Sequence, residues 1–244
     1  MELKIREDGI NSYEQVMLIY RAALKQMNTR LEILSEEFQQ RYKYNPIEHI
    51  KSRMKTGDSI ARKLRRRGCE SSLENMVRYC NDIAGIRIIC SFTSDIYHLA
   101  EIISSQRDLE VILIKDYIKR PKPSGYKSYH MLVMMPVYFS EQIIETKVEI
   151  QIRTIAMDFW ASLEHKIQYK FVGEAPEHIR AELLECSAMI SALDAKMLSL
   201  NQEIMEQSEM EDKAAALLEQ ERRKAKFRAQ NHSHYGDESS MFPD

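Results

Sequence analysis

The chain has 244 residues, 44% of them hydrophobic and 30% charged, with a formal net charge of −2. This length suits one sizeable domain with helical additions, and the charge argues against a protein that binds nucleic acid through its overall charge. The first residues lack the apolar core of a leader sequence, and no apolar run approaches the roughly 20 residues that span a bilayer. We therefore expect a soluble, cytoplasmic protein with no membrane segment, in which the four cysteines are ordinary thiols.

Helical signals open the chain. Apolar residues recur every three or four positions over residues 12–42, which predicts one long amphipathic helix. Asn45, Pro46 and Glu48 then follow in the order of an N-cap, a first helical residue and a capping-box acid. We therefore expect a second helix to begin there.

A short basic window comes next. Residues 51–67 hold eight Lys or Arg and one acid, Asp58, so the window carries +7 in a slightly acidic chain. Asp58 can cap a helix that Gly68 ends as a left-handed C-cap. The basic face of such a helix either clamps a polyphosphate or simply faces solvent. The residues on this face, or just before it, are Arg53, Lys55, Ser59, Lys63 and Arg66.

The middle of the chain is predicted to form a sheet. Residues 83–92, 110–118, 129–138 and 146–153 are short segments rich in Ile, Val and aromatic side chains, which is typical of strands. Residues 94–107, between the first two, have the apolar spacing of a crossover helix. This series predicts an α+β domain with a mixed β-sheet flanked by helices, and with long helices near both ends of the chain.

Two of the strands carry charged residues within apolar sequence. Asp82 stands at the start of the first strand, and Arg87 lies within it between isoleucines. Glu149, Gln151 and Arg153 alternate with apolar residues in the last strand, so all three point to one face. That face is either the polar outside of a half-exposed strand or a catalytic surface. Asp82 and Glu149 also suit a Mg²⁺ site, because this ion takes one or two carboxylates and completes its shell with water and phosphate.

Residues 117–130 form a basic loop that contains Pro, Gly and aromatic residues. Gly125 lets the backbone turn, and the ring of Tyr126 either stacks on a base or packs the loop. The loop side chains that can meet phosphates are Lys122, Lys127 and His130.

Helical periodicity returns after residue 154. Apolar residues from Leu183 to Ile204 alternate at spacings of three and four, which predicts a helix-pairing seam. This seam packs either on the chain's own first helix or on another subunit. The predicted organisation is one domain over residues 1–205, made of helices at 12–80, a sheet core at 82–153 and helices at 154–205, and then a charged helix and a disordered tail over 206–244.

A series of five runs carries a family resemblance: R-M-K-T-G-D-S-I-A-R-K at 53–63, D-I-A-G-I-R at 82–87, K-P-S-G-Y-K-S-Y-H at 122–130, E-I-Q-I-R-T at 149–154 and F-W-A-S-L-E-H at 159–165. Together they resemble the synthetase domain of the RelA/SpoT family, and specifically its small single-domain members, the small alarmone synthetases. The resemblance implies that the β,γ-diphosphate of ATP moves to the ribose 3′-hydroxyl of GDP or GTP, which releases AMP and makes (p)ppGpp. It also implies synthesis without a hydrolase domain, and a homo-oligomer, a tetramer, formed through the terminal helices.

The resemblance further implies roles for single residues. Arg53 and Arg87 would flank the adenine, and the residues on the triphosphate would be Lys55, Ser59, Lys63 and Arg66. Asp82 and Glu149 would bind Mg²⁺, and Glu149 would also take the proton from the attacking hydroxyl. Tyr126 would stack on the guanine, and the acceptor or the catalytic strand would be supported by Lys122, Lys127, His130, Gln151 and Arg153.

Two alternatives use the same residues. Toxin-like relatives with these motifs pyrophosphorylate the 3′ end of tRNA, and a non-enzymatic RNA-binding oligomer would use the basic face of residues 51–67. Basic residues confined to one window fit a nucleotide pocket better than a track for RNA. Residues 48–52 and Asp158 differ from the pattern of those small members that their product activates in a central cleft, so such activation is not expected here.

Overall fold

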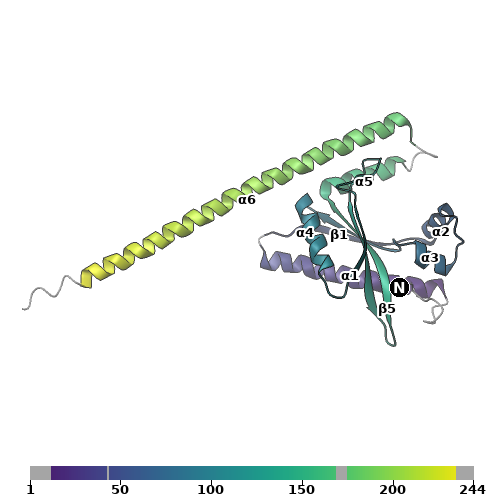
Figure 1. Cartoon of the computed structure of the whole chain (residues 1–244), viewed down its shortest axis with the longest axis horizontal. Coiled ribbons are helices and arrows are strands. Elements are labelled where there is room, and N and C mark those ends of the chain that lie inside the picture. Colours follow the sequence, from purple (N-terminus) through teal and green to yellow (C-terminus); the bar gives the residue numbers. More distant parts are fainter. Residues whose placement is uncertain (1–11, 43, 169–174, 235–244) are drawn as a thin grey trace, which may run out of the picture. The chain divides into compact units, whose positions relative to one another are not determined.

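A computed structural model describes residues 12–42, 44–168 and 175–234 (Figure 1). The helices are α1 (Tyr13–Arg41), α2 (Gly57–Arg66), α3 (Leu73–Tyr79), α4 (Thr93–Ser104), α5 (Ile155–Gln168) and α6 (Glu177–His234). The strands are β1 (Ile47–Met54), β2 (Ala84–Cys90), β3 (Glu110–Asp116), β4 (Tyr129–Tyr138) and β5 (Ile143–Thr154). Within the described ranges, no helix is both long and apolar enough to cross a membrane.

The strands form one mixed sheet in the order β1-β2-β5-β4-β3. β2 and β5 are parallel neighbours, whereas the other three pairings are antiparallel. The predicted α+β class with a mixed sheet is therefore confirmed. Residues up to Ala195 form one compact unit that contains the sheet and the first turns of α6, and residues from Lys196 onward form a second unit.

The core lies between α1 and the apolar face of the sheet. α1 begins at Ser12, whose side chain accepts a hydrogen bond from the Gln15 amide in a capping box, and its buried stripe includes Met27 and Leu31. On β5, Ile150 and Ile152 belong to the same buried core. Burying one such side chain stabilises the fold by about 1.5–3 kcal/mol. Because strand side chains alternate, the opposite face of β5 remains available for polar residues.

The helix predicted from Asn45 is wrong, because this segment leads into β1. The Asn45 side chain accepts a hydrogen bond from the Ile47 amide, 3.0 Å away, and so turns the chain into the strand instead of capping a helix. β1 then pairs with β2 from Ile47 to Met54, with one shift of register between Ile47 and His49. Pairing with the buried strand β2 forms more backbone hydrogen bonds than a helix N-cap does. Strand pairing therefore overrides the capping signal of Asn45.

Other boundaries differ from the predicted ones by a few residues. α2 is capped by Thr56 rather than Asp58, and Gly68 follows it with φ +69°, as the predicted left-handed C-cap requires. α6 extends to His234, whereas the sequence from residue 230 onward, which has almost nothing to bury, predicts a disordered tail. The rest of that tail, residues 235–244, lies outside the described residues.

Candidate active site

The register of the sheet aligns polar residues from distant parts of the chain. One row crosses all five strands through Lys51, Arg87, Gln151, His130 and Lys115. A second row lies two residues from the first on each strand. In it, Arg53 of β1 lies opposite Gly85 of β2, which lies opposite Glu149 of β5. Residues two apart on a strand share a face, so both rows lie on one side of the sheet. Gln151 and Glu149 alternate with buried Ile150, which confirms the alternation predicted for β5.

Asp82, just before β2, is bound by two lysines. Its Oδ2 lies 2.7 Å from the Nζ of Lys55, which follows β1, and its Oδ1 lies 2.6 Å from the Nζ of Lys63, on α2. Burial acts to raise the pKa of Asp82, but the hydrogen bonds from the two lysines outweigh it and hold the pKa below its usual value. Two ammonium groups on one carboxylate leave surplus positive charge, which suits an anionic ligand.

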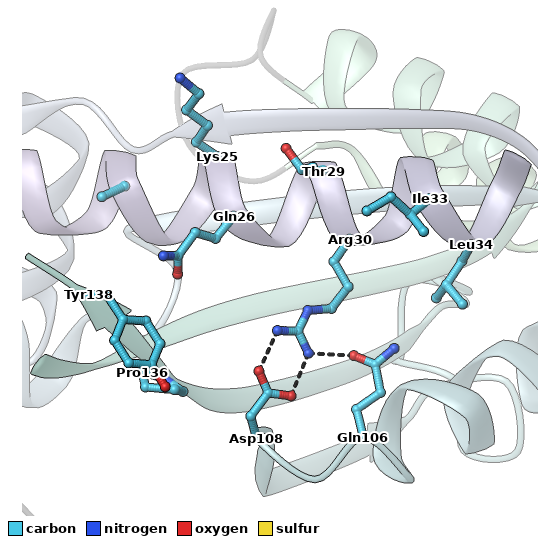
Figure 2. A pocket seen from close by; sticks show the side chains of 11 residues that line it. Lys25, Gln26, Thr29, Arg30, Ile33, Leu34, Gln106, Asp108, Pro136 and Tyr138 are labelled. Carbon is cyan, nitrogen blue, oxygen red and sulfur yellow. Dashed lines mark hydrogen bonds and ion pairs between the residues drawn. The ribbon is translucent and has the colours of Figure 1, made fainter.

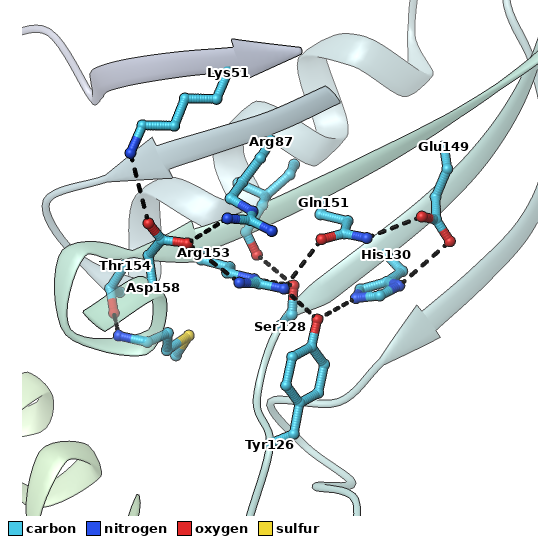
Figure 3. Close-up of polar contacts among 12 residues, drawn as sticks. Lys51, Arg87, Tyr126, Ser128, His130, Glu149, Gln151, Arg153, Thr154 and Asp158 are labelled. Carbon is cyan, nitrogen blue, oxygen red and sulfur yellow. Dashed lines mark hydrogen bonds and ion pairs between the residues drawn. The ribbon is translucent and has the colours of Figure 1, made fainter. Parts of the chain in front are cut away.

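Asp158, in the first turn of α5, joins three cationic side chains (Figure 3). Its Oδ1 accepts hydrogen bonds from Arg87 at 3.0 Å and from Arg153 at 3.2 Å, and the Nζ of Lys51 lies 3.9 Å from its Oδ2. Burial and the neighbouring Arg153 lower the pKa of Arg87, and Asp158 opposes them. The Asp158 carboxylate is only 14% exposed, so it fixes the two guanidinium groups from a largely water-excluded position.

Glu149 is held by its neighbours on the sheet. The Gln151 amide donates to Glu149 Oε2 at 2.9 Å and accepts from Arg153 at 3.0 Å, and His130 Nδ1 lies 3.7 Å from Glu149 Oε1. Burial acts to raise the pKa of Glu149, but His130 and Gln151 lower it further than burial raises it. Asp82 acts on the same pKa in the upward direction, so the two carboxylates interact electrostatically. Glu149 is therefore a partly buried, ionised carboxylate at neutral pH.

Tyr126 connects the basic loop to this strand. Its hydroxyl lies 2.9 Å from His130 Nε2 and accepts a hydrogen bond from Arg153 (Figure 3). The Arg153 guanidinium lies 5.0 Å from the centre of the Tyr126 ring, and the Lys122 ammonium lies 4.6 Å from it. The preceding Gly125 has φ +88°, which confirms the predicted turn. The ring is thus held next to cations that can also meet the phosphates of a ligand.

Three of the predicted residues, Ser59, Arg66 and Lys127, take no part in the hydrogen bonds and ion pairs described above. Ser59 lies in the first turn of α2, where its backbone N–H donates to the capping Thr56 and its hydroxyl accepts from Thr56 at 2.9 Å. Arg66 is exposed in the last turn of α2. Lys127 donates to Ser191 of α6 at 2.6 Å.

The cleft between β1, β2 and β5 has a volume of about 210 Å³. It is lined by Lys51, Ser52, Arg53, Asp82, Gly85, Ile86, Arg87, Glu149 and Gln151. A larger hollow of about 740 Å³ lies between α1, the segment before β3 and the end of β4 (Figure 2). The acid there, Asp108, is already bound by Arg30 through two hydrogen bonds, one of them 2.7 Å long, and Arg30 also donates to Gln106. The smaller cleft is therefore the candidate active site, since its lining combines the carboxylates of Asp82 and Glu149 with the cationic side chains of Lys51, Arg53 and Arg87.

Sequence reasoning left Asp158, Lys51 and Tyr117 out of the predicted site. Tyr117 packs edge-on against His130, with ring centres 5.1 Å apart. Lys51 was missed because the sequence predicts a helix for the segment that forms β1. A predicted helix does not show which residues line up across a sheet. Asp158 follows the end of β5 by a single helical turn, so its position in the first turn of α5, next to Arg153, was the available signal.

Carboxylates, arginines and lysines gathered on one polar face of a mixed sheet, beside a loop with a half-buried tyrosine, define a protein that binds phosphorylated nucleotides. The sequence profile of the region found in RelA/SpoT proteins matches residues 52–174. The chain belongs to the RelA/SpoT family.

Individual relatives agree with this assignment. The GTP pyrophosphokinase YwaC of Bacillus subtilis (strain 168) is 45% identical over 195 residues, which cover 80% of this chain and 93% of that protein. The crystal structure of small alarmone synthetase 1 from Bacillus subtilis bound to its product pppGpp has a TM-score of 0.74 and 34% identity, covering 79% of this chain and 97% of that chain. The structure of the same synthetase bound to AMPCPP has a TM-score of 0.68 and 31% identity, covering 80% of this chain and 99% of that chain.

Proposed function

We propose that the chain is a (p)ppGpp synthetase of the stringent response. It transfers the β,γ-pyrophosphate of ATP to the 3′-hydroxyl of GDP or GTP and releases AMP. The observation that carries this proposal is the small cleft, in which Glu149 and Asp82 face cationic side chains in a chain that is 45% identical to a GTP pyrophosphokinase. We assign this activity to one synthetase domain over residues 1–205. We also propose that the protein is cytoplasmic.

The β1–α2 side of the cleft, which we call the donor side, is assigned to ATP. It comprises Arg53, Lys55, Ser59, Lys63, Arg66, Asp82 and Arg87. Lys55 and Lys63 supply positive charge for the triphosphate, and the planar guanidinium groups of Arg53 and Arg87 suit stacking on the adenine. The neighbour solved with AMPCPP, an ATP analogue, supports a donor nucleotide in this fold.

The loop of residues 117–130, with Gln151 and Arg153 of β5, forms what we call the acceptor side. Tyr126 stacks on the guanine, and the acceptor phosphates meet cationic side chains near it, among them Lys122, Lys127, His130 and Arg153. The neighbour bound to its product pppGpp supports a guanine nucleotide as acceptor.

Chemistry takes place where the two sides meet. The acceptor 3′-oxygen forms a bond to the β-phosphorus of ATP while the bond between that phosphorus and the α,β-bridging oxygen breaks, and AMP leaves. Glu149 accepts the hydroxyl proton, which its ionised carboxylate can do at neutral pH. Gln151 and His130 hold that carboxylate in place. The remaining contribution is positioning and charge neutralisation, on which phosphoryl-type transfer mainly depends.

The cleft also suits a magnesium ion, which Asp82 and Glu149 would hold. Both carboxylates line the same cleft, and both have lowered pKa values, so both are ionised at neutral pH. This donor set matches the preference of Mg²⁺ for one or two carboxylates together with phosphate and water. When bound, the ion would neutralise charge on the β- and γ-phosphates.

A direct assay tests the proposed activity. Incubating the pure protein with Mg²⁺, γ-labelled ATP and GDP should move the label into ppGpp with an equal yield of AMP, and GTP should give pppGpp. Folded protein that transfers no label to either guanine nucleotide would overturn the proposal. Label recovered in added tRNA would instead favour the toxin-like alternative, and binding of RNA without transfer would favour the RNA-binding oligomer. Relatives named for guanine nucleotides favour the synthetase over both.

We also propose that the chain forms a homo-oligomer, a tetramer, through the apolar seam of α6. Leu193 belongs to the compact unit and is 56% exposed, so at this position the seam does not pack on α1. Replacing Leu193 and Leu200 with Asp should lower the mass found by light scattering, while Ser199→Asp with Gln202→Asp adds the same charge off the seam and should leave the mass unchanged. An oligomer that survives the seam variant in a folded protein must use another surface.

A further inference from the structure

A stripe of polar residues on α6 contacts the acceptor side. Ser187, Ser191 and Asp194 are spaced by four and three residues, so they lie on one face of the helix. Each of them bonds to a residue of the loop or of the end of β5. This face is distinct from the apolar seam at Leu193, which is exposed.

The closest approach is at Ser187. Its hydroxyl donates to the carbonyl oxygen of Gly125 at 2.6 Å, and the residue is only 6% exposed. A Cβ added to Gly125 would lie 2.8 Å from the Cβ of Ser187 and 3.2 Å from the Leu184 side chain. Glycine at this position therefore serves two needs, a positive φ and the contact with α6. Tyr126 is the next residue in the loop.

The other two bonds hold the residues that flank the site. Lys127 donates to the Ser191 hydroxyl at 2.6 Å, on the far side of Tyr126 from Gly125. Thr154 donates to Asp194 Oδ2 at 2.6 Å, and its oxygen accepts from the Met157 amide where α5 begins. Thr154 directly follows Arg153, the residue that bonds to Tyr126. All three α6 bonds thus end on residues adjacent in sequence to Tyr126 or Arg153.

We propose that the first turns of α6 position the acceptor side, with Ser187, Ser191 and Asp194 as positioning residues for the guanine nucleotide. The inference rests on the proposed function and adds a helix that no motif of the site contains. These side chains do not touch the reacting atoms. They fix the loop backbone on both sides of Tyr126 and the end of β5, so the ring needs no ordering when the acceptor binds.

The only tryptophan of the chain reports on this contact. Trp160 of α5 is 4% exposed, and its indole N–H donates to the carbonyl oxygen of Leu183 at 2.9 Å. Leu183 lies one turn before Ser187 on α6. The fluorescence of Trp160 can therefore report whether α6 is packed in this position, without any measurement of activity.

The test replaces the three polar residues with alanine: Ser187→Ala, Ser191→Ala and Asp194→Ala in the full chain. Alanine has the highest helix propensity, so α6 itself is not weakened. Losing three hydrogen bonds should raise the KM for GDP about five- to fiftyfold, while the KM for ATP stays within twofold. The matched control, Glu182→Ala with Glu185→Ala and Met189→Ala, changes three exposed residues of the same turns and should leave both KM values unchanged. If the triple variant does not fold, Ser187→Ala alone should raise the KM for GDP about two- to tenfold.

The outcomes separate this inference from the proposed function. A selective rise in the KM for GDP, together with a red-shifted Trp160 emission, supports the positioning role. An unchanged KM for GDP in an active triple variant overturns it, whatever the fluorescence shows. Equal rises for both nucleotides with lower thermal stability also overturn it, since α6 then acts only on the fold. A wild-type protein without transferase activity would instead remove the proposed function, and Trp160 would still report whether the three residues seat α6.

Discussion

The two sides of the cleft are stabilised in different ways. On the donor side, Asp82 bonds to Lys55 and Lys63, and all three residues lie in the stretch of chain from the end of β1 to the start of β2. On the acceptor side, the loop around Tyr126 is bonded to α6, some sixty residues further along the chain. The two lysines of the donor side are thus held by ion pairs within one stretch of the chain, residues 55–82, whereas the acceptor loop depends on a distant helix.

This difference indicates which changes should affect one nucleotide alone. A donor-side substitution alters charge that is contributed directly to the cleft. An acceptor-side substitution can act through the position of a backbone segment. The residue that serves both sides is Glu149, which interacts electrostatically with Asp82 and contacts His130 next to Tyr126.

The largest effect is expected at Glu149, because a change there removes the chemistry that both sides serve. Glu149→Gln keeps the size and loses the charge, and loss of a general base costs about 10²–10⁴-fold in rate. We expect turnover to fall by at least this factor while both nucleotides still bind. Label transfer from ATP to GDP measures the rate, and circular dichroism checks the fold. Turnover within threefold of wild type would remove Glu149 from the catalytic position.

A donor-side variant should weaken the binding of ATP and leave the binding of GDP unchanged. Lys63→Ala removes an ammonium group assigned to the triphosphate, and a hydrogen bond to a charged group contributes about 1.5–3 kcal/mol. The KM for ATP should rise about 10- to 150-fold, and the KM for GDP should stay within twofold. Arg65→Ala removes the same charge from an exposed position of α2 and serves as the matched control. Equal rises for ATP and GDP would show that the two sides are not separable.

Acid should act oppositely on the two sides. The pKa of Asp82 is lowered in the folded protein, because the lysine hydrogen bonds outweigh burial, so its contribution to stability is present above its usual pKa and is lost as the pH falls through the lowered value. Burial raises the pKa of Asp194, and its bond with Thr154 only partly offsets this. The contribution of Asp194 is therefore present below its usual pKa and is lost as the pH rises through the raised value.

Two variants make this sign difference measurable. Between pH 5 and about pH 3, Asp82→Asn should lose less thermal stability than wild type, because the acid-sensitive pair is gone. Asp194→Asn should lose more over the same range, because a group that gains stability on protonation is gone. Melting temperatures at several pH values measure both, and shifts of the same sign in the two variants would contradict the assignment.

Much of the fold followed from local patterns, and the failures have physical causes. The strand alternation at Glu149 and Gln151 was readable because the side-chain period of a strand is two. β1 was missed because Asn45 carries a helix-capping signal that pairing with β2 overrides. The link between Ser187 and Gly125 joins residues 62 apart in sequence, and no periodicity predicts which face of α6 meets the loop.

Calorimetric titration of GDP and of an unreactive ATP analogue into Tyr126→Ala tests the central claim, that one cleft binds two nucleotides at separable sides. Base stacking on an aromatic ring contributes about 1–3 kcal/mol, so GDP affinity should fall about 5- to 150-fold while affinity for the analogue stays within twofold. Tyr126→Phe keeps the ring without its hydroxyl bonds to His130 and Arg153, and should keep most of the GDP affinity. Unchanged GDP affinity in Tyr126→Ala, or an equal loss for both nucleotides together with lower thermal stability, would contradict the account.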